Sequence, residues 1–175
     1  DSGQSGHTVM ISALVHGNEL CGAWAIKGML ENGLRPQRGQ LTLALCNLAA
    51  FDRFDPAHHD ASRFVDEDMN RQWQVDRMAS GSTLERRRAA ELRPFVEQAD
   101  WLLDLHSMHE RAAPLLLAGM QQTMAGIQAP AGARLMLVSN GGKFVSHPDP
   151  ALIGQPAAKM ISPVARIAQN ALTKP

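Results

Sequence analysis

Thr8-Val-Met-Ile-Ser-Ala-Leu-Val15, followed directly by His16-Gly-Asn-Glu19, is the stretch that decides the fold class of this 175-residue chain. Its first eight residues form a nearly continuous apolar run, as in a strand buried on both faces. Apolar residues at helical spacing follow from Cys21 to Glu31, and Asn32-Gly33 supplies a stop signal. Alternating leucines at 40–46 predict a second strand. This strand–loop–helix–strand order favours a parallel α/β unit with a right-handed crossover.

The rest of the chain extends this pattern. Residues 83–99 have helical periodicity, with Ser82 or Thr83 as the expected N-cap and Glu85 in the first turn. The Arg86-Arg87-Arg88 run of that helix is expected to be a solvated face. Residues 47–83 show no clean period, and a long irregular stretch of this kind is often functional. Further strands are expected at 101–105, 115–118 and 134–138, and a further helix at 163–172.

The composition argues against several function classes. Seventeen basic and 17 acidic residues give no net charge, so nothing points to nucleic acid or to a membrane surface as a partner. No apolar run approaches the roughly 18–20 residues that span a bilayer. The opening residues do not resemble a signal peptide, and Cys21 and Cys46 are too few for a disulfide framework. We therefore expect a cytoplasmic protein in which both cysteines are small core residues.

Metal-ligating residue types follow two of the predicted strands. His16 and Glu19 come after the first strand, and His106 ends the strand at 101–105. Neighbouring parallel strands lie about 5 Å apart, so His106 can reach the point where His16 and Glu19 converge. Two histidines and one carboxylate with an open fourth position form the ligand set of a catalytic zinc. Asp104 is either an acceptor for a ligand imidazole or a surface strand residue.

The irregular stretch contains a third group of polar residues, Arg63-Phe-Val-Asp-Glu-Asp-Met-Asn-Arg71. Arg63, Asn70 and Arg71 bring planar donors that can bind a carboxylate or stabilise a developing oxyanion. Alternatively, the three acids at 66–68 simply neutralise these arginines in a surface network.

Three motifs together carry a family resemblance: His-Gly-Asn-Glu-Leu-Cys-Gly at 16–22, Asp-Met-Asn-Arg at 68–71 and Asp-Leu-His-Ser at 104–107. They resemble the signature blocks of the succinylglutamate desuccinylase/aspartoacylase family, a branch of the zinc carboxypeptidase-like hydrolases. The resemblance implies a mostly parallel, twisted sheet flanked by helices. It also implies one zinc ion per chain, held by His16, Glu19 and His106. By the same resemblance, Asn70 and Arg71 grip the substrate carboxylate and Arg63 polarises the scissile carbonyl.

The C-terminal part departs from that family pattern. Residues 1–119 are expected to form the zinc-binding catalytic core, and 120–175 a divergent or truncated C-terminal segment of the same domain. Family members carry a general-base glutamate downstream of the last zinc ligand, whereas Asp149 is the only acid after Glu110 here. Three explanations stay open: the chain is a fragment, its C-terminal part has diverged, or Glu110 serves as the base.

The resemblance implies zinc-dependent hydrolysis of the amide or ester bond of a small anionic N-acyl amino acid. Two alternatives belong to the same site: a catalytically impaired zinc- or carboxylate-binding homologue that lacks the base, and a carboxypeptidase-type peptidase. A plain α/β domain without metal is a third alternative. The oligomeric state stays open.

Overall fold

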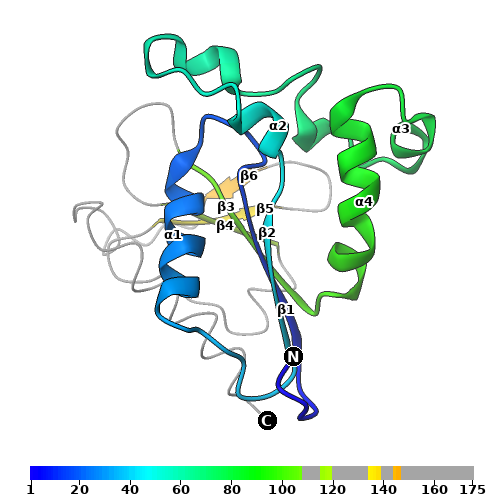
Figure 1. Cartoon of the computed structure of the whole chain (residues 1–175). Helices are drawn as coiled ribbons and strands as arrows, with labels where there is room; N and C mark the ends of the chain where they lie inside the picture. The colour runs from blue at the N-terminus through cyan, green and yellow to red at the C-terminus, as the bar shows by residue number, and fades with distance from the viewer. Residues whose placement is uncertain (108–114, 120–133, 139–143, 147–175) are drawn as a thin grey trace. The chain divides into compact units, whose positions relative to one another are not determined.

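The computed structural model describes residues 1–107 and three later strands at 115–119, 134–138 and 144–146 (Figure 1). Residues 1–107 form one compact unit, and the three later strands belong to a second. The expected helix at 163–172 lies outside the described residues. The expected boundary at residue 119 stays a prediction.

The first unit is built on a parallel sheet of three strands. β1 (Thr8–Ala13) lies in the centre, between β2 (Gln40–Leu45) and β3 (Trp101–Leu105). Ala13 pairs with Leu45 on one side and with Leu105 on the other, so the three carboxyl ends are level. The parallel unit expected from the sequence is therefore confirmed.

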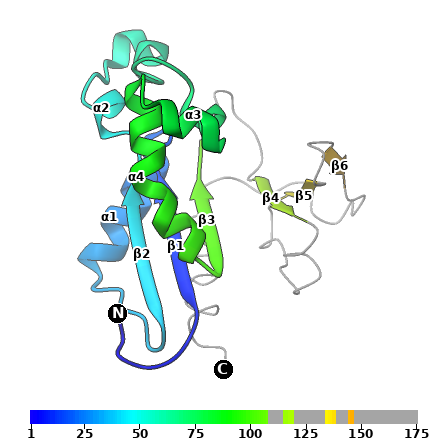
Figure 2. The same cartoon turned by 90° about the vertical axis from the view of Figure 1, so that its right-hand side faces the viewer.

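Two long helices cover opposite faces of this sheet (Figures 1 and 2). α1 (Leu20–Glu31) packs through Gly22, where a Cβ atom would lie 2.7 Å from the Cβ of Ala13. α4 (Leu84–Gln98) covers the other face, and its N-cap is Thr83, whose side chain accepts from the backbone N–H of Arg86. A core of small and flexible apolar side chains fills the α4 side: Met10, Val15, Ala44, Cys46, Met69, Met78, Ala89 and Leu92.

The irregular stretch between β2 and α4 folds into four short elements. These are α2 (Leu48–Phe51), the 3₁₀ helices η1 (Pro56–Ser62) and η2 (Met69–Arg71), and α3 (Val75–Ser80). Side chains cap three of them: Asn47 accepts from Ala50, Asp55 from Ala57 and Asp68 from Asn70. Elements this short bury no continuous apolar face, so apolar residues do not recur at a regular spacing in this part of the sequence.

One expectation about burial is wrong. Cys21 is exposed in the first turn of α1, whereas Cys46 is buried as expected. Leu102 on β3 is 49% exposed, because β3 is an edge strand of the three-stranded sheet. Phe95 on α4 is likewise exposed.

The arginine run is not simply a solvated face. The Arg86 Nε atom lies 2.7 Å from a carboxyl oxygen of Glu67. Arg88 donates from Nε to the carbonyl of Cys46 at 2.7 Å and from NH2 to that of Leu45 at 3.1 Å. Of the three arginines, only Arg87 is exposed, while Arg86 and Arg88 are half-buried. The start of α4 is therefore tied to the end of β2 and to the loop before η2.

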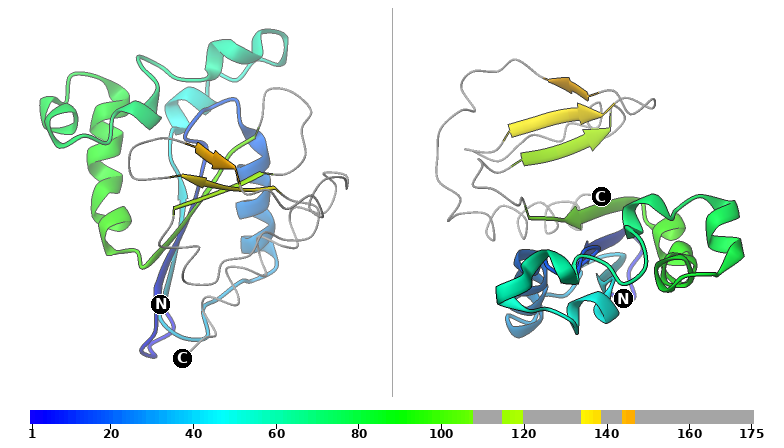
Figure 3. Two further views of the ribbon diagram at one scale, coloured as in Figure 1. Left: turned by 180° about the vertical axis from the view of Figure 1, so that it is seen from behind. Right: turned by 90° about the horizontal axis from the view of Figure 1, so that it is seen from above.

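The second unit contains β4 (Leu115–Gly119), β5 (Arg134–Val138) and β6 (Phe144–Ser146). β4 pairs with β5 in parallel and β5 with β6 in antiparallel fashion, as Figure 3 shows. The sequence predicted the first two strands and not the third. No helix in the described parts of either unit is long and apolar enough to cross a lipid bilayer.

The packing of α1 gives a test with a matched control. In Gly22→Ala the new methyl group meets Ala13 and Leu105, whereas in Gly28→Ala nothing lies within 4 Å of it. Both changes gain similar helix propensity, so we expect Gly28→Ala to raise the free energy of unfolding by about 0.5–1 kcal/mol. Overpacking should instead make Gly22→Ala less stable by about 1–3 kcal/mol. Urea denaturation measures both, and equal effects would contradict the close packing of α1 on the sheet.

Candidate metal centre

The first two candidate ligands lie in the turn between β1 and α1. The chain leaves β1 through Leu14, a buried residue with a φ of 57°. A positive φ is strained for a side chain of this kind and persists only where the surroundings hold it. Here the carbonyl of Leu14 accepts from the backbone N–H of Asn47 at 2.8 Å, which ties the turn to the end of β2.

Gly17, next to His16, is required by close packing. A Cβ atom there would lie 2.4 Å from the carbonyl carbon of Ala50 and 2.4 Å from the carbonyl oxygen of Ser62. The Gly17 N–H also donates to the carbonyl of Arg63 at 3.0 Å. The missing side chain of Gly17 therefore lets the Arg63 segment approach the turn.

His16, Glu19 and His106 meet at the carboxyl edge of the sheet. One oxygen of the Glu19 carboxyl lies 2.7 Å from Nδ1 of His16, and the other lies 2.8 Å from Nδ1 of His106. One potential ligand atom from each of the three residues lies within 4.8 Å of the others. His16 and Glu19 are buried, at 2% and 6% exposure, whereas His106 is half-buried. The convergence expected from the strand ends is present.

Each imidazole also has an aspartate at its far nitrogen. Nε2 of His106 lies 2.7 Å from Asp104, and Nε2 of His16 lies 3.1 Å from Asp68. The second oxygen of Asp104 accepts from the Ser12 hydroxyl at 2.7 Å. Asp104 is an exposed residue of β3 whose carboxyl group nevertheless contacts the His106 imidazole, as the first of the two alternatives expects. Asp68 was treated as a neutraliser of arginines, and no spacing rule could have paired it with a histidine 52 positions away.

The site holds Glu19 ionised and favours a proton on His106. Burial raises the pKa of Glu19, but hydrogen bonds from His106 and His16 outweigh it and hold that pKa well below its usual range. Hydrogen bonds to Asp104 and Glu19 raise the pKa of His106 to about 10. Three carboxyl groups thus surround two imidazole rings, which gives the site a strong preference for positive charge.

The arrangement suits a divalent metal ion. Both Nδ1 atoms face the same carboxyl group, while both Nε2 atoms face aspartates that can accept the remaining ring proton. Carboxylates placed behind ligand histidines in this way orient the rings and raise their basicity. Two imidazoles and a carboxylate also leave coordination positions open, as in catalytic rather than structural sites.

Arg63 reaches the same cluster from the irregular stretch. Its NH1 donates to Glu19 at 3.3 Å, and its NH2 lies 3.1 Å from Nε2 of His16. Asn70 and Arg71 lie on η2, immediately after Asp68. Within the described part of the chain, neither of their side chains forms a hydrogen bond or an ion pair, and Arg71 is exposed. Glu110, the candidate base, lies outside the described residues.

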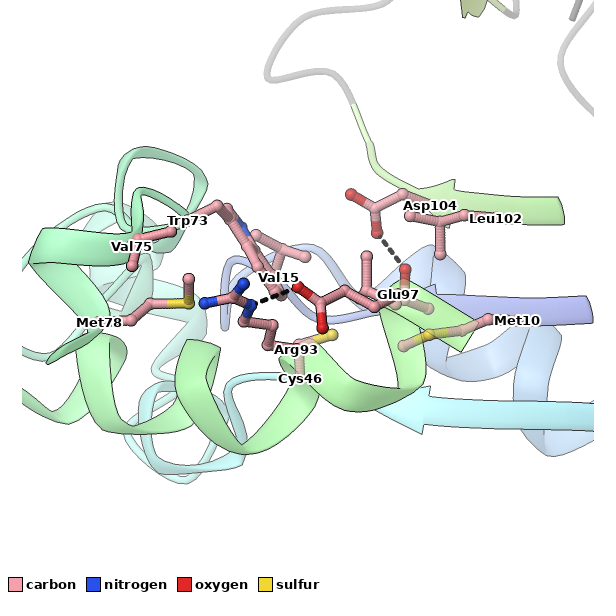
Figure 4. Close-up of a pocket in the computed structure, with 12 residues that line it drawn as sticks. Met10, Val15, Cys46, Trp73, Val75, Met78, Arg93, Glu97, Leu102 and Asp104 are labelled. Atoms are coloured by element: carbon pink, nitrogen blue, oxygen red, sulfur yellow. Dashed lines mark hydrogen bonds and ion pairs between the residues drawn. The ribbon is translucent and has the colours of Figure 1, made fainter. Parts of the chain in front are cut away.

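A separate cavity of about 400 Å³ lies on the α4 face of the sheet (Figure 4). Its walls are mostly apolar, with Met10, Val15 and Met78 among them, and Asp104 faces it from β3. None of His16, Glu19 and His106 lines this cavity. The candidate metal centre therefore lies outside it.

Comparisons with known proteins bear on the family and the fold. The sequence profile described as the succinylglutamate desuccinylase/aspartoacylase catalytic domain matches residues 5–147. Murine aminoacylase 3 superposes over 97% of this chain and 64% of its own, with a TM-score of 0.58 and 21% identity. A mutant of the same murine protein gives a TM-score of 0.59 at 21% identity, over 97% of this chain and 63% of its own. The expected zinc carboxypeptidase-like α/β fold is thus confirmed.

Two further findings complete the comparison. The succinylglutamate desuccinylase from Chromobacterium violaceum is 27% identical over 59% of this chain and 35% of its own, with a TM-score of 0.48. No curated protein matches the chain in sequence. The chain spans 64% of the length of murine aminoacylase 3.

From this cluster we expect the chain to bind one divalent metal ion, and zinc is the ion used to test it. We expect His106→Ala to weaken zinc binding by at least about 100-fold, because two remaining ligands rarely hold a catalytic metal. His58→Ala is the matched control, since His58 is exposed and contacts only Asp55 among the described side chains. Chelator competition measures both affinities. Zinc binding that survives in His106→Ala would contradict the ligand set.

Proposed function

The chain belongs to the succinylglutamate desuccinylase/aspartoacylase family of hydrolases, and from this premise we propose that it cleaves the amide bond of small, anionic N-acyl amino acids with the help of one zinc ion. The observation that carries the proposal is the meeting of His16, Glu19 and His106 at one edge of the sheet, where Asp68, two residues before Asn70, contacts His16. A metal ligand set with an anion-binding group nearby in the chain would suit a substrate that has both an acyl carbonyl and a carboxylate.

The metal would be held by Nδ1 of both histidines and by the Glu19 carboxyl group. When bound there, zinc supplies Lewis acidity and a coordinated water that ionises near neutral pH. Asp68 and Asp104 accept the Nε2 protons and keep both rings in the tautomer that leaves Nδ1 free for the metal. The low pKa of Glu19 keeps its carboxyl group ionised for the same purpose.

Arg63 is the residue placed to stabilise charge on the scissile carbonyl. A guanidinium group has five N–H donors, and two of its nitrogens contact Glu19 and His16. Its side chain is 39% exposed, so part of the guanidinium-bearing side chain stays accessible to a ligand. Donors aimed at developing negative charge in a partly enclosed site are among the strongest contributors to catalysis.

Asn70 and Arg71 are the proposed binding groups for the substrate carboxylate. Asp68 lies two residues before Asn70. Its carboxyl group contacts His16 and accepts a hydrogen bond from the backbone N–H of Asn70 at 2.9 Å. The same short helix thus connects the metal site to the proposed carboxylate site. This link gives a reason for the enzyme to prefer substrates whose carboxylate lies a short distance from the scissile bond.

Glu110 is the proposed general base, which takes a proton from the attacking water and delivers it to the leaving nitrogen. With zinc, we expect the chain to release the amino acid from N-acetylaspartate or N-succinylglutamate, and a chelator to abolish the release. Glu110→Gln should lower turnover by about 10²–10⁴-fold while the uncleaved substrate still binds. Colorimetric detection of the released amine measures the rate, with His58→Ala as the control.

Three results would change this proposal. If zinc-loaded wild-type protein binds the substrate but releases no product, the chain is a zinc- and carboxylate-binding protein without turnover. Turnover that is unaffected by Glu110→Gln would assign the base to another residue. Turnover that persists without any divalent metal would contradict the metal-dependent reaction.

The role of Arg71 is tested by Arg71→Lys. A bidentate guanidinium–carboxylate pair cannot be reproduced by an ammonium group, so the affinity for an N-acyl amino acid should fall by about tenfold or more. The affinity for the corresponding neutral amide should change little. Arg53→Lys is the control, since Arg53 is exposed on the same irregular stretch. Isothermal calorimetry compares the two ligands, and equal losses for both would show that Arg71 does not bind the carboxylate.

A further inference from the structure

Glu85 is a fully buried acidic residue that the proposed reaction does not use. It lies in the first turn of α4 and has no exposed surface. The sequence suggested only a favourable charge near the start of a helix. Such a charge is normally solvated, because burying a carboxylate is costly unless it accepts several hydrogen bonds.

The Glu85 carboxyl group accepts four hydrogen bonds, all from amide N–H groups. One oxygen accepts from the Asn47 side chain at 3.0 Å and from the Val65 backbone at 2.7 Å. The other accepts from the backbones of Asp66 at 3.1 Å and Glu67 at 3.3 Å. Three consecutive backbone N–H groups thus point at one buried side chain, so its position determines the path of this loop.

Side chains of the same loop accept hydrogen bonds from the start of α4. The Asp66 carboxyl accepts from the Leu84 N–H at 2.8 Å, and Glu67 accepts from the Thr83 hydroxyl at 2.8 Å. Glu67 also pairs with Arg86. The segment 65–67 and the first turn of α4 therefore bind each other in both directions. We call this set of contacts the Glu85 clasp, and Glu85 is its buried part.

The clasped segment runs directly into the candidate site. The next residue is Asp68, which contacts Nε2 of His16, and η2 with Asn70 and Arg71 follows. On its other side is Arg63, whose guanidinium contacts Glu19. Through Asn47, Glu85 also reaches the end of β2. A single buried carboxyl group thus connects α4, the sheet edge and the segment that carries the polar residues of the site.

We propose that Glu85 is a positioning residue for the metal and substrate site, because it holds the backbone of 65–67 and thereby places Asp68 against His16. That the positioned residues form a metal and substrate site rests on the proposed function. That Glu85 holds the backbone of 65–67 does not depend on it. Glu85 contacts neither the metal ligands nor the groups proposed to bind the substrate. It acts on them through the loop.

The decisive variant is Glu85→Gln, which keeps the shape of the side chain but turns one acceptor into a donor that faces N–H groups. We expect zinc affinity to fall by about tenfold or more, as when a residue supporting a metal ligand is lost. In an Asp68→Asn background the same change should cause little further loss, because Asp68 is the route of the effect. Glu91→Gln, an exposed carboxyl on the same helix, is the matched control and should leave zinc affinity unchanged.

Amide hydrogen exchange in the metal-free protein gives a second readout. The Asn70 N–H donates to Asp68 and not to Glu85. Faster exchange at Asn70 in Glu85→Gln, at a temperature where the protein stays folded, would show that the loss is transmitted along the loop. A role in stability alone predicts a lower melting temperature with unchanged exchange at Asn70 and unchanged zinc affinity of the folded protein.

The outcomes separate this proposal from the proposed function. Additive effects of Glu85→Gln and Asp68→Asn on zinc affinity, or unchanged exchange at Asn70, would overturn the positioning role. Wild-type protein that binds no zinc would overturn the proposed function, while exchange at Asn70 would still decide the role of Glu85. If Glu85→Gln does not fold, Glu85→Asp takes its place. That variant keeps the carboxyl group but is one methylene shorter, and it should give the same two effects in weaker form.

Discussion

The two oxygens of the Glu19 carboxyl group hold together the parts of the chain on which the site depends. One oxygen contacts Nδ1 of His16 and the guanidinium of Arg63, and the other contacts Nδ1 of His106 and the backbone N–H of Ser107. Glu19 and His106 are 87 positions apart. They meet because β1 and β3 are parallel and in register, so that the ends of both strands lie at one edge of the sheet. Small changes in that register would separate them.

Such a cluster is expensive to bury unless its charges are balanced. Glu19, Asp68 and Asp104 surround two imidazoles and one guanidinium. With both imidazoles neutral, the carboxylates outnumber the cations, and a divalent ion would offset the excess. Without such an ion, a proton on His106 plays the same part, because the hydrogen bonds to Asp104 and Glu19 raise the pKa of His106 to about 10. The same carboxyl groups that orient the rings for a metal therefore also stabilise the metal-free fold.

The sequence predicted the parts of this protein that follow from periodic burial. β1, α1 and α4 bury apolar residues, β2 and β3 are short runs rich in leucine, and the positions of all five were found to within a few residues. The convergence of His16, Glu19 and His106 followed, because His16 and His106 lie at or just after the ends of strands whose parallel order could be inferred. Asp68 and Glu85 were not assigned these roles. Their partners are backbone groups or distant side chains, and no local pattern records such contacts. The arginine run was misjudged for the same reason, since Arg86 and Arg88 bind acceptors outside their own helix.

The stretch between β2 and α4 differs physically from the rest of the first unit. Its path is set by side chains that bind backbone groups, as Asn47, Asp55, Asp68 and Glu85 do, and less by apolar faces packed on the sheet. Hydrogen bonds of this kind are directional, so they place a backbone within narrow limits while leaving the exposed side chains unconstrained. Arg71 is such a side chain. The polar scaffold can therefore stay the same while exposed side chains along η2 change, and the core around Met10 and Leu92 need not be altered. If the proposed function holds, substrate preference would be adjustable along η2 without loss of the proposed metal site, provided that the Glu85 clasp is kept.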